Sequence, residues 1–174
     1  MTGKIRIGIS SCLLGEHVRY DGGHKYDDRI IGSLGSFCTF VPVCPEVGCG
    51  LAVPRETMRL EGDPARPRLV ICTSRLDLTD RMLDYCRSRV AELEHEELCG
   101  FIFKKRSPSC GLHHVPVHDD LGNPAGCGRG LFAAAVTDRL PLLPVAEEEE
   151  LHDPAFREPF IERVMAKAEA GRIA

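Results

Sequence analysis

The sequence predicts an α/β fold in which helices flank a mainly parallel sheet. Three observations support this prediction: short apolar runs alternate with segments of helical periodicity, the chain has 174 residues, and its composition of 43% hydrophobic and 28% charged residues is that of an ordinary globular protein. At roughly 150 residues per domain, this length predicts a single domain over residues 1–174. The sequence contains no internal repeat and no low-complexity segment.

In the first half of the chain, short apolar runs that end near glycine or proline predict strands. Lys4–Ser10 alternates isoleucine with polar residues or glycine, and Phe40–Cys44 stops at a proline. Between them, Ile30–Ile31 predicts a short helix that is broken at Gly32 and Gly35. Glu61–Arg68 is rich in glycine and proline and is predicted to be a surface loop, after which Leu69–Cys72 forms a third strand.

In the second half, the clearest element is a helix from Thr79 to His95, where apolar residues recur at spacings of three and four. The remaining predicted elements are a strand at Gly100–Lys104, a small ribbon over Val115–Gly122, a helix at Gly130–Thr137, a strand at Leu142–Val145 and an amphipathic helix at Ala155–Ala170. The acidic run Glu147–Glu150 is expected to be a solvated face without a function.

The composition argues against several classes of protein. The net charge of −4 disfavours tracking along a nucleic-acid backbone, which needs a basic face, so no extended nucleic-acid binding is expected. No apolar run approaches the ~20 residues that span a bilayer, so no membrane insertion is expected. The first residues lack the pattern of a secretory signal, and a reducing cytoplasm is the expected location.

The most unusual feature of the composition is its nine cysteines, an odd number that excludes a fully paired disulfide framework in a monomer. Cys12, Cys44 and Cys110 each follow a predicted strand, and loops at the carboxyl ends of parallel strands lie on one edge of a sheet. Converging thiolates are soft ligands that favour zinc, copper(I) or an iron–sulfur cluster. The alternative is that these three cysteines are small buried hydrophobic residues.

The other cysteines differ in their surroundings. Those predicted to pack in the core or at strand borders are Cys38, Cys72, Cys86 and Cys99. Cys127 lies between two glycines and is left without a role. Cys49 follows Cys44 and Glu46 closely, so that a thiol and a carboxylate beside a ligand could serve as acid, base or additional ligand.

Four groups of polar residues have two interpretations each. Arg19–Asp21 could form a substrate-side wall or an ion-paired turn, and Arg55 could bind an anionic group or fix the neighbouring loop. Lys104–Arg106 gives a positive edge that could attract an anionic substrate or lower the pKa of a thiol, or it could be a solvated strand end. His113 and His114 could ligate zinc or lie at the surface.

Five ordered motifs resemble those of a widespread bacterial family of formerly unknown function that includes the thiouracil desulfidases. These motifs are Ser10–Gly15, Val18–Gly22, Val43–Val47, Gly50–Glu56 and Lys105–Gly111. The tail is similar to one branch of that family, whose members are often fused to or adjacent to a second uncharacterised domain. The segments that carry this similarity are Gly128–Phe132, Arg139–Val145 and Phe160–Val164. Residues from about 123 to 174 are therefore expected to be a branch-specific C-terminal part.

The resemblance implies a [4Fe-4S] cluster, held by three cysteines, whose open iron takes sulfur from a thiocarbonyl substrate without net redox change. Carried over motif by motif, the implied ligands are Cys12, Cys44 and Cys110. The implied catalytic residues are Glu46, Cys49 and Ser107, and the implied substrate contacts are Ser109, Arg19 and Arg55. Which of Cys44 and Cys49 is the ligand, and which is catalytic, stays open.

The leading hypothesis is therefore a [4Fe-4S]-dependent desulfidase that acts on a small thiolated compound such as a thiopyrimidine. Glu46 would transfer the proton of an attacking water, and serine donors would polarise the ring as negative charge develops. The alternative hypothesis is a non-catalytic domain that binds zinc or a cluster and acts with a partner protein. A partner domain or a homodimer is compatible with either hypothesis.

Overall fold

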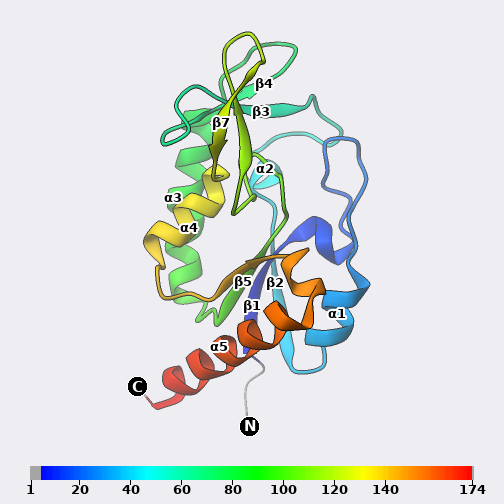
Figure 1. Cartoon of the computed structure of the whole chain (residues 1–174), viewed down its shortest axis with the longest axis vertical. Coiled ribbons are helices and arrows are strands. Elements are labelled where there is room, and N and C mark those ends of the chain that lie inside the picture. Colours follow the sequence, from blue (N-terminus) through cyan, green and yellow to red (C-terminus); the bar gives the residue numbers. More distant parts are fainter. Residues whose placement is uncertain (1–4, 174) are drawn as a thin grey trace.

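The computed structural model describes residues 5–173, and these form an α/β arrangement of two four-stranded sheets with helices around them (Figure 1). The first sheet is entirely parallel, with the strand order β2-β1-β5-β8. Its strands are β1 (Ile5–Ser10), β2 (Cys38–Val43), β5 (Gly100–Phe103) and β8 (Val145–Glu147).

Helices cover both faces of the parallel sheet because its strands present apolar side chains to both sides. On one face, Ile7 and Ile9 of β1 pack with residues of α1 (Asp28–Leu34) and α5 (Pro154–Ile173). On the other face, Phe101 and Phe103 of β5 pack with residues of α3 (Thr79–His95) and α4 (Leu131–Arg139). The two faces thus belong to two separate hydrophobic clusters.

The second sheet lies beyond the carboxyl ends of the parallel strands (Figure 1). It has the order β4-β3-β6-β7, in which the β3–β6 pair is parallel and the two outer pairs are antiparallel. Its strands are β3 (Met58–Glu61), β4 (Arg68–Ile71), β6 (Val115–His118) and β7 (Pro124–Gly128). This sheet therefore closes the side of the molecule toward which the loops after β1, β2 and β5 point.

Several predicted elements occur where the sequence placed them. The helix α3 has the predicted bounds, and β1, β2 and β5 agree with the prediction to within two residues, apart from Lys4, which lies outside the described residues. The ribbon over Val115–Gly122 is the first strand and turn of a hairpin formed by β6 and β7. The main parallel sheet with flanking helices is thus confirmed.

Other predictions about elements were wrong. α1 continues through Gly32, where a break was predicted, although it ends at Leu34, just before the second predicted break at Gly35. It begins at Asp28, because Asp27 accepts a hydrogen bond from the Ile30 amide. β8 begins at Val145 rather than at Leu142, whose side chain is 86% exposed. The strand β3 was not predicted, because its four residues include an arginine and a glutamate and show no apolar run.

The acidic run Glu147–Glu150 is also a correction, because its first half is not solvated. Glu147 and Glu148 are 3% and 4% exposed, whereas Glu149 is exposed. Both buried carboxylates accept hydrogen bonds from the chain after β5. No helix within residues 5–173 is long and apolar enough to cross a membrane.

Candidate functional site

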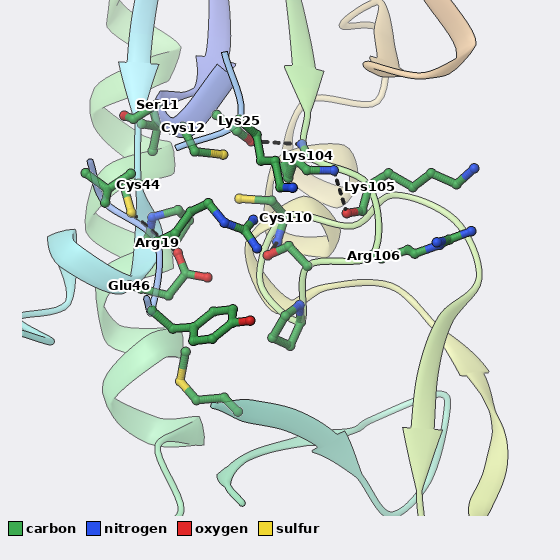
Figure 2. Close-up of a pocket in the computed structure, with 18 of the residues that line it drawn as sticks. Ser11, Cys12, Arg19, Lys25, Cys44, Glu46, Lys104, Lys105, Arg106 and Cys110 are labelled. Carbon is green, nitrogen blue, oxygen red and sulfur yellow. Dashed lines mark hydrogen bonds between the residues drawn. The ribbon is translucent and has the colours of Figure 1, made fainter. Parts of the chain in front are cut away.

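A cavity of about 520 Å³ lies at the carboxyl ends of the parallel strands. Its walls come from the loops after β1, β2 and β5 and from the start of β3. The cysteines that line it are Cys12, Cys44 and Cys110, and their sulfur atoms face a common space (Figure 2). Residues far apart in the sequence thus meet at one place.

The topology of the parallel sheet explains this convergence. Cys12 lies in the 3-10 turn η1 (Ser11–Leu14) directly after β1, and Cys44 directly follows β2 and precedes the short helix α2 (Pro45–Gly48). Cys110 lies in the loop after β5. Because β1 pairs with both β2 and β5, the ends of these three strands are neighbours.

Burial strongly disfavours the charged form of each of these thiols. It raises the pKa of Cys12 to about 11, although Lys104 and Arg19 partly offset this effect. It raises the pKa of Cys44 to about 12, and the nearby Glu46 carboxylate adds to the rise. The pKa of Cys110 is also raised well above its usual value by burial and then by Glu46. With pKa values raised in this way, the three cysteines are protonated thiols at neutral pH.

Glu46 sits at the centre of a short chain of hydrogen bonds. Its two carboxylate oxygens accept hydrogen bonds from the Ser109 hydroxyl and, at 3.5 Å, from the Cys44 thiol. The Ser107 and Ser109 hydroxyl oxygens are 3.1 Å apart, and because the Ser109 proton points to Glu46, Ser107 is the donor between them. Ser107 also accepts the Cys110 amide proton at 3.1 Å.

The two serines have different positions relative to the cavity. Ser107 is among the residues that line it, whereas Ser109 is fully buried and is not a lining residue. The hydroxyl of Ser109 is directed to Glu46 instead. The resemblance implied a catalytic role for Ser107 and a substrate contact for Ser109, whereas the geometry gives only Ser107 direct access to the cavity.

Cys49 also lies outside the lining of the cavity. It follows α2, its thiol donates a hydrogen bond to the Glu46 carbonyl oxygen at 3.3 Å, and its side chain packs against the apolar cluster on the α3 side. Arg81 of α3 donates to the carbonyl oxygens of Cys49 and Gly50 at 2.6 and 2.7 Å. The structure therefore groups Cys44, rather than Cys49, with the other two cavity cysteines.

The cavity has a strongly basic lining. The cationic residues that line it are Arg19, Lys25, Arg55, Lys104, Lys105 and Arg106. The acidic lining residues are Glu46 and Glu149. Lys25 was not singled out by the sequence, although it lies in the same loop as Arg19. Such a lining favours anionic groups and negative charge that develops during a reaction.

The arginines have structural contacts as well as access to the cavity. The Arg55 guanidinium donates to the Val18 carbonyl oxygen at 2.9 Å, and its Nε is buried without a hydrogen-bond partner among the described residues. Arg19 extends into the cavity, with its Nε 3.8 Å from Asp21 and its Cζ 5.5 Å from the Tyr20 ring centre (Figure 2). The geometry fits both interpretations of each arginine: each one lines the cavity, where it can contact a substrate, and each one also contacts residues of a neighbouring turn or loop.

The histidine pair after Cys110 does not line the cavity. The rings of His113 and His114 are 6.5 Å apart, and His113 Nε2 lies 3.8 Å from Glu150. Within residues 5–173, no three side chains of His, Cys, Asp or Glu lie close enough together to hold one metal ion. The described part of the chain thus offers no preformed mononuclear zinc site.

The remaining cysteines lie away from the cavity. Cys38, Cys86 and Cys99 are buried in the two hydrophobic clusters, as predicted. Cys72 is half-buried in the turn that follows β4 rather than inside the strand. Cys127 is exposed on β7. Six of the nine cysteines, including Cys49, thus do not line the cavity.

Comparisons with known proteins give three matches. A family model described as 2-thiouracil desulfurase matches residues 7–148. The uncharacterized protein YbbK of Bacillus subtilis (strain 168) is 30% identical over 108 residues, which are 59% of this chain and 71% of that protein. A solved structure of a [4Fe-4S]-dependent thiouracil desulfidase, TudS, has a TM-score of 0.69 and 28% identity, over 90% of this chain and 97% of that one.

Proposed function

The chain belongs to the 2-thiouracil desulfurase family, and on this premise we propose that it is a [4Fe-4S]-dependent desulfidase that removes sulfur from a small thiolated pyrimidine. The enzyme class, cleavage of a carbon–sulfur bond, follows from the family and from the solved relative. The observation that supports the finer proposal is that Cys12, Cys44 and Cys110 line one cavity together with Glu46.

The donor set of the cavity fits an iron–sulfur cluster. Thiolates are the usual ligands of such clusters, and Cys12, Cys44 and Cys110 would hold the cluster here. The raised pKa values of the three thiols mean that loading the cluster would release protons from them.

The proposed reaction exchanges sulfur for oxygen: the substrate thiocarbonyl and water give a carbonyl and hydrogen sulfide, with no change of oxidation state. When bound, the cluster supplies a thiophilic iron with an open position that can take the sulfur. The chain's own residues must then bind the ring, deprotonate water and protonate the leaving sulfur.

Glu46 is the residue best placed to transfer the proton. Its carboxylate lies on the cavity wall, where it can accept a proton from a water that attacks the thiocarbonyl carbon. The Ser109 hydroxyl holds one carboxylate oxygen, so the other is directed toward the Cys44 side of the cavity. We assign Ser109 to orienting Glu46 and Ser107 to contacting the substrate.

The basic lining stabilises the negative charge that develops on the ring when water adds to it. Arg19 and Lys104 are the cations whose charges act on Cys12, so they lie close to the cluster-binding end of the cavity. An oriented cation of this kind lowers the energy of the transition state more than that of the neutral substrate. A reducing cytoplasm is the expected setting because it keeps the three thiols available for iron.

Anaerobic reconstitution with iron and sulfide tests the cofactor, and release of sulfide from 2-thiouracil tests the activity. We expect about four irons per chain, with cluster content lost in Cys12→Ala, Cys44→Ala and Cys110→Ala and retained in Cys127→Ala. Full cluster content in all three cavity variants would overturn the ligand assignment. Stoichiometric zinc and no sulfide release would instead favour the accessory-domain hypothesis.

A further inference from the structure

The loop that carries much of the cavity wall is tied at both ends by two consecutive buried carboxylates. We call residues Lys104–His113, which include Ser107, Ser109 and Cys110, the Cys110 loop. Glu147 ends β8, and Glu148 follows it directly. They lie beside the two ends of the Cys110 loop because β8 pairs with β5, from which the loop starts.

Glu147 holds the far end of the loop. Its Oε1 accepts hydrogen bonds from the backbone amides of Leu112 at 2.9 Å and His113 at 3.1 Å. Its own amide donates to Glu150 Oε2 at 2.8 Å, which fixes the backbone that carries it. The Glu147 carboxylate therefore holds the backbone amides of the second and third residues after Cys110.

Glu148 holds the near end of the loop. One carboxylate oxygen bonds the Lys104 ammonium, and the other accepts the Lys105 amide proton at 2.7 Å. The Glu148 amide donates to the Phe103 carbonyl oxygen at 3.1 Å, which anchors it to the end of β5. The Lys104 ammonium is thereby kept on the cavity wall, where it acts on Cys12.

Burying two adjacent carboxylates makes the free energy of folding less favourable. A buried charge must be paired or fully hydrogen-bonded, and a well-packed apolar pair of similar size would give equal or better stability. Between them, these carboxylates accept bonds from four donors of the Cys110 loop, whose residues are Lys104, Lys105, Leu112 and His113. Their contacts therefore concentrate on one loop of the cavity.

We propose that Glu147 and Glu148 are positioning residues for the cavity: they bracket the Cys110 loop, and Glu148 also orients the Lys104 ammonium. This inference rests on the proposed function for its catalytic consequence, because Cys110, Ser107 and the Ser109–Glu46 contact are all placed by this loop. Misplacing such groups by about 1 Å is enough to cost roughly 100-fold in rate.

The first test uses the full chain without added iron, so that it does not depend on activity. In Glu147→Leu, we expect amide exchange of a peptide covering residues 104–113 to be about tenfold faster than in the wild type, and alkylation of Cys110 to accelerate. Glu147→Gln keeps a carbonyl acceptor and should restore slow exchange. Glu148→Gln can no longer accept from both Lys104 and Lys105, so the near end should loosen.

The matched control is Glu61→Gln, which neutralises a fully buried carboxylate of the second sheet outside the cavity. It should leave exchange of residues 104–113 and alkylation of Cys110 unchanged. Unchanged loop exchange in Glu147→Leu would overturn the proposal. Equal acceleration in Glu61→Gln would overturn it too, because the effect would then be one of general stability.

The second test measures the reconstituted enzyme. We expect Glu148→Gln to retain most of its iron while kcat for sulfide release falls about tenfold, and Glu61→Gln to keep the wild-type kcat. A wild-type kcat in Glu148→Gln would overturn the role of Glu148 in catalysis. Failure of the wild type to bind a cluster or release sulfide would instead overturn the proposed function. Amide exchange of the Cys110 loop would still decide whether Glu147 and Glu148 hold the two ends of that loop.

Discussion

Individual side chains show how the chemistry of the cavity depends on contacts that cross the fold. Glu46 alone is a carboxylate on a short helix, but Ser109 and Cys44 give its two oxygens different surroundings. Cys49 is close to Glu46 in sequence, and yet its thiol is directed to a backbone carbonyl oxygen rather than into the cavity. The direction of each side chain, more than its spacing in sequence, decides which groups can meet a substrate.

Replacement of Glu46 tests the proton-transfer role at the residue scale. In Glu46→Gln the side chain keeps its size and one oxygen but cannot take a proton, so kcat for sulfide release should fall by about 100-fold or more. Iron content should stay near the wild-type value because Glu46 is not among the proposed ligands. The measurement is sulfide release at saturating 2-thiouracil, with iron determined on the same samples.

The matched control for this prediction is Ser109→Ala. It removes the hydrogen bond that orients Glu46 but leaves the carboxylate, so the decrease in kcat should be smaller, about tenfold. If Glu46→Gln released sulfide at the wild-type rate, Glu46 would have no role as a base.

At the scale of elements, close packing between neighbouring strands leaves little freedom at a few positions. Gly8 in β1 lies against the Phe101 ring of β5, and a Cβ added there would overlap the ring. Gly32 in α1 has open space around the position of an added Cβ. Substitutions at these two glycines therefore test whether side chains pack more tightly between β1 and β5 than around Gly32 of α1.

We expect Gly8→Ala to destabilise the protein by about 2 kcal/mol, because the Phe101 ring must leave its place in the core. Gly32→Ala should instead stabilise it by about 0.5–1 kcal/mol, since alanine favours the helix and meets no neighbour. Urea denaturation of both variants measures these differences. Equal stability of the two variants would contradict the packing of β1 against β5.

The second sheet contains a buried carboxylate whose titration affects stability. Glu61 of β3 accepts hydrogen bonds from Arg75 at 2.6 and 2.8 Å and from Arg59 at 2.7 Å. The two hydrogen bonds from Arg75, and after them the one from Arg59, lower the pKa of Glu61 from 4.5 to about 2. Between these two pH values the unfolded chain binds more protons than the folded one, so stability rises with pH there.

Glu61→Gln should therefore be less stable than the wild type at neutral pH, by roughly 2 kcal/mol. The stabilising contribution of Glu61 is complete above pH 4.5 and is lost as the pH falls toward 2, so the difference between the two proteins should shrink over that range. Denaturation midpoints at a series of pH values measure it. A difference that stayed constant down to pH 2 would show that Glu61 does not titrate in this way.

At the scale of the whole molecule, the cavity exists because two sheets meet. The loops after β1, β2 and β5 supply the cysteines, and residues at the start of β3 close the opposite wall. No segment of the chain contains the site by itself. A ligand that joins these loops should consequently stabilise the entire fold.

Loading of the cluster should raise the melting temperature of the wild type by at least about 5 °C, because it links the loops that follow three strands. Cys110→Ala should lose this gain, whereas Cys127→Ala, on exposed β7, should keep it. Melting curves recorded anaerobically before and after reconstitution measure the change. An equal gain in Cys110→Ala would place the cluster elsewhere.

The sequence by itself determined the features that depend on local pattern. The period of apolar residues in Thr79–His95 specifies the helix α3, and alternation in β1 specifies a strand buried against helices. The positions of Cys12, Cys44 and Cys110 after strands predicted their convergence, because parallel strands bring their carboxyl ends to one edge. The family resemblance, which the comparisons confirmed, also followed from ordered motifs.

Only the tertiary structure decided which side chains face the cavity and which lie behind its walls. Glu147 and Glu148 look like part of a solvated acidic run, but pairing of β8 with β5 buries them against the Cys110 loop. The strand β3 has no apolar run of its own and is held by partners on either side. Such features depend on contacts between distant segments, and local pattern contains no information about which donors a buried carboxylate will meet.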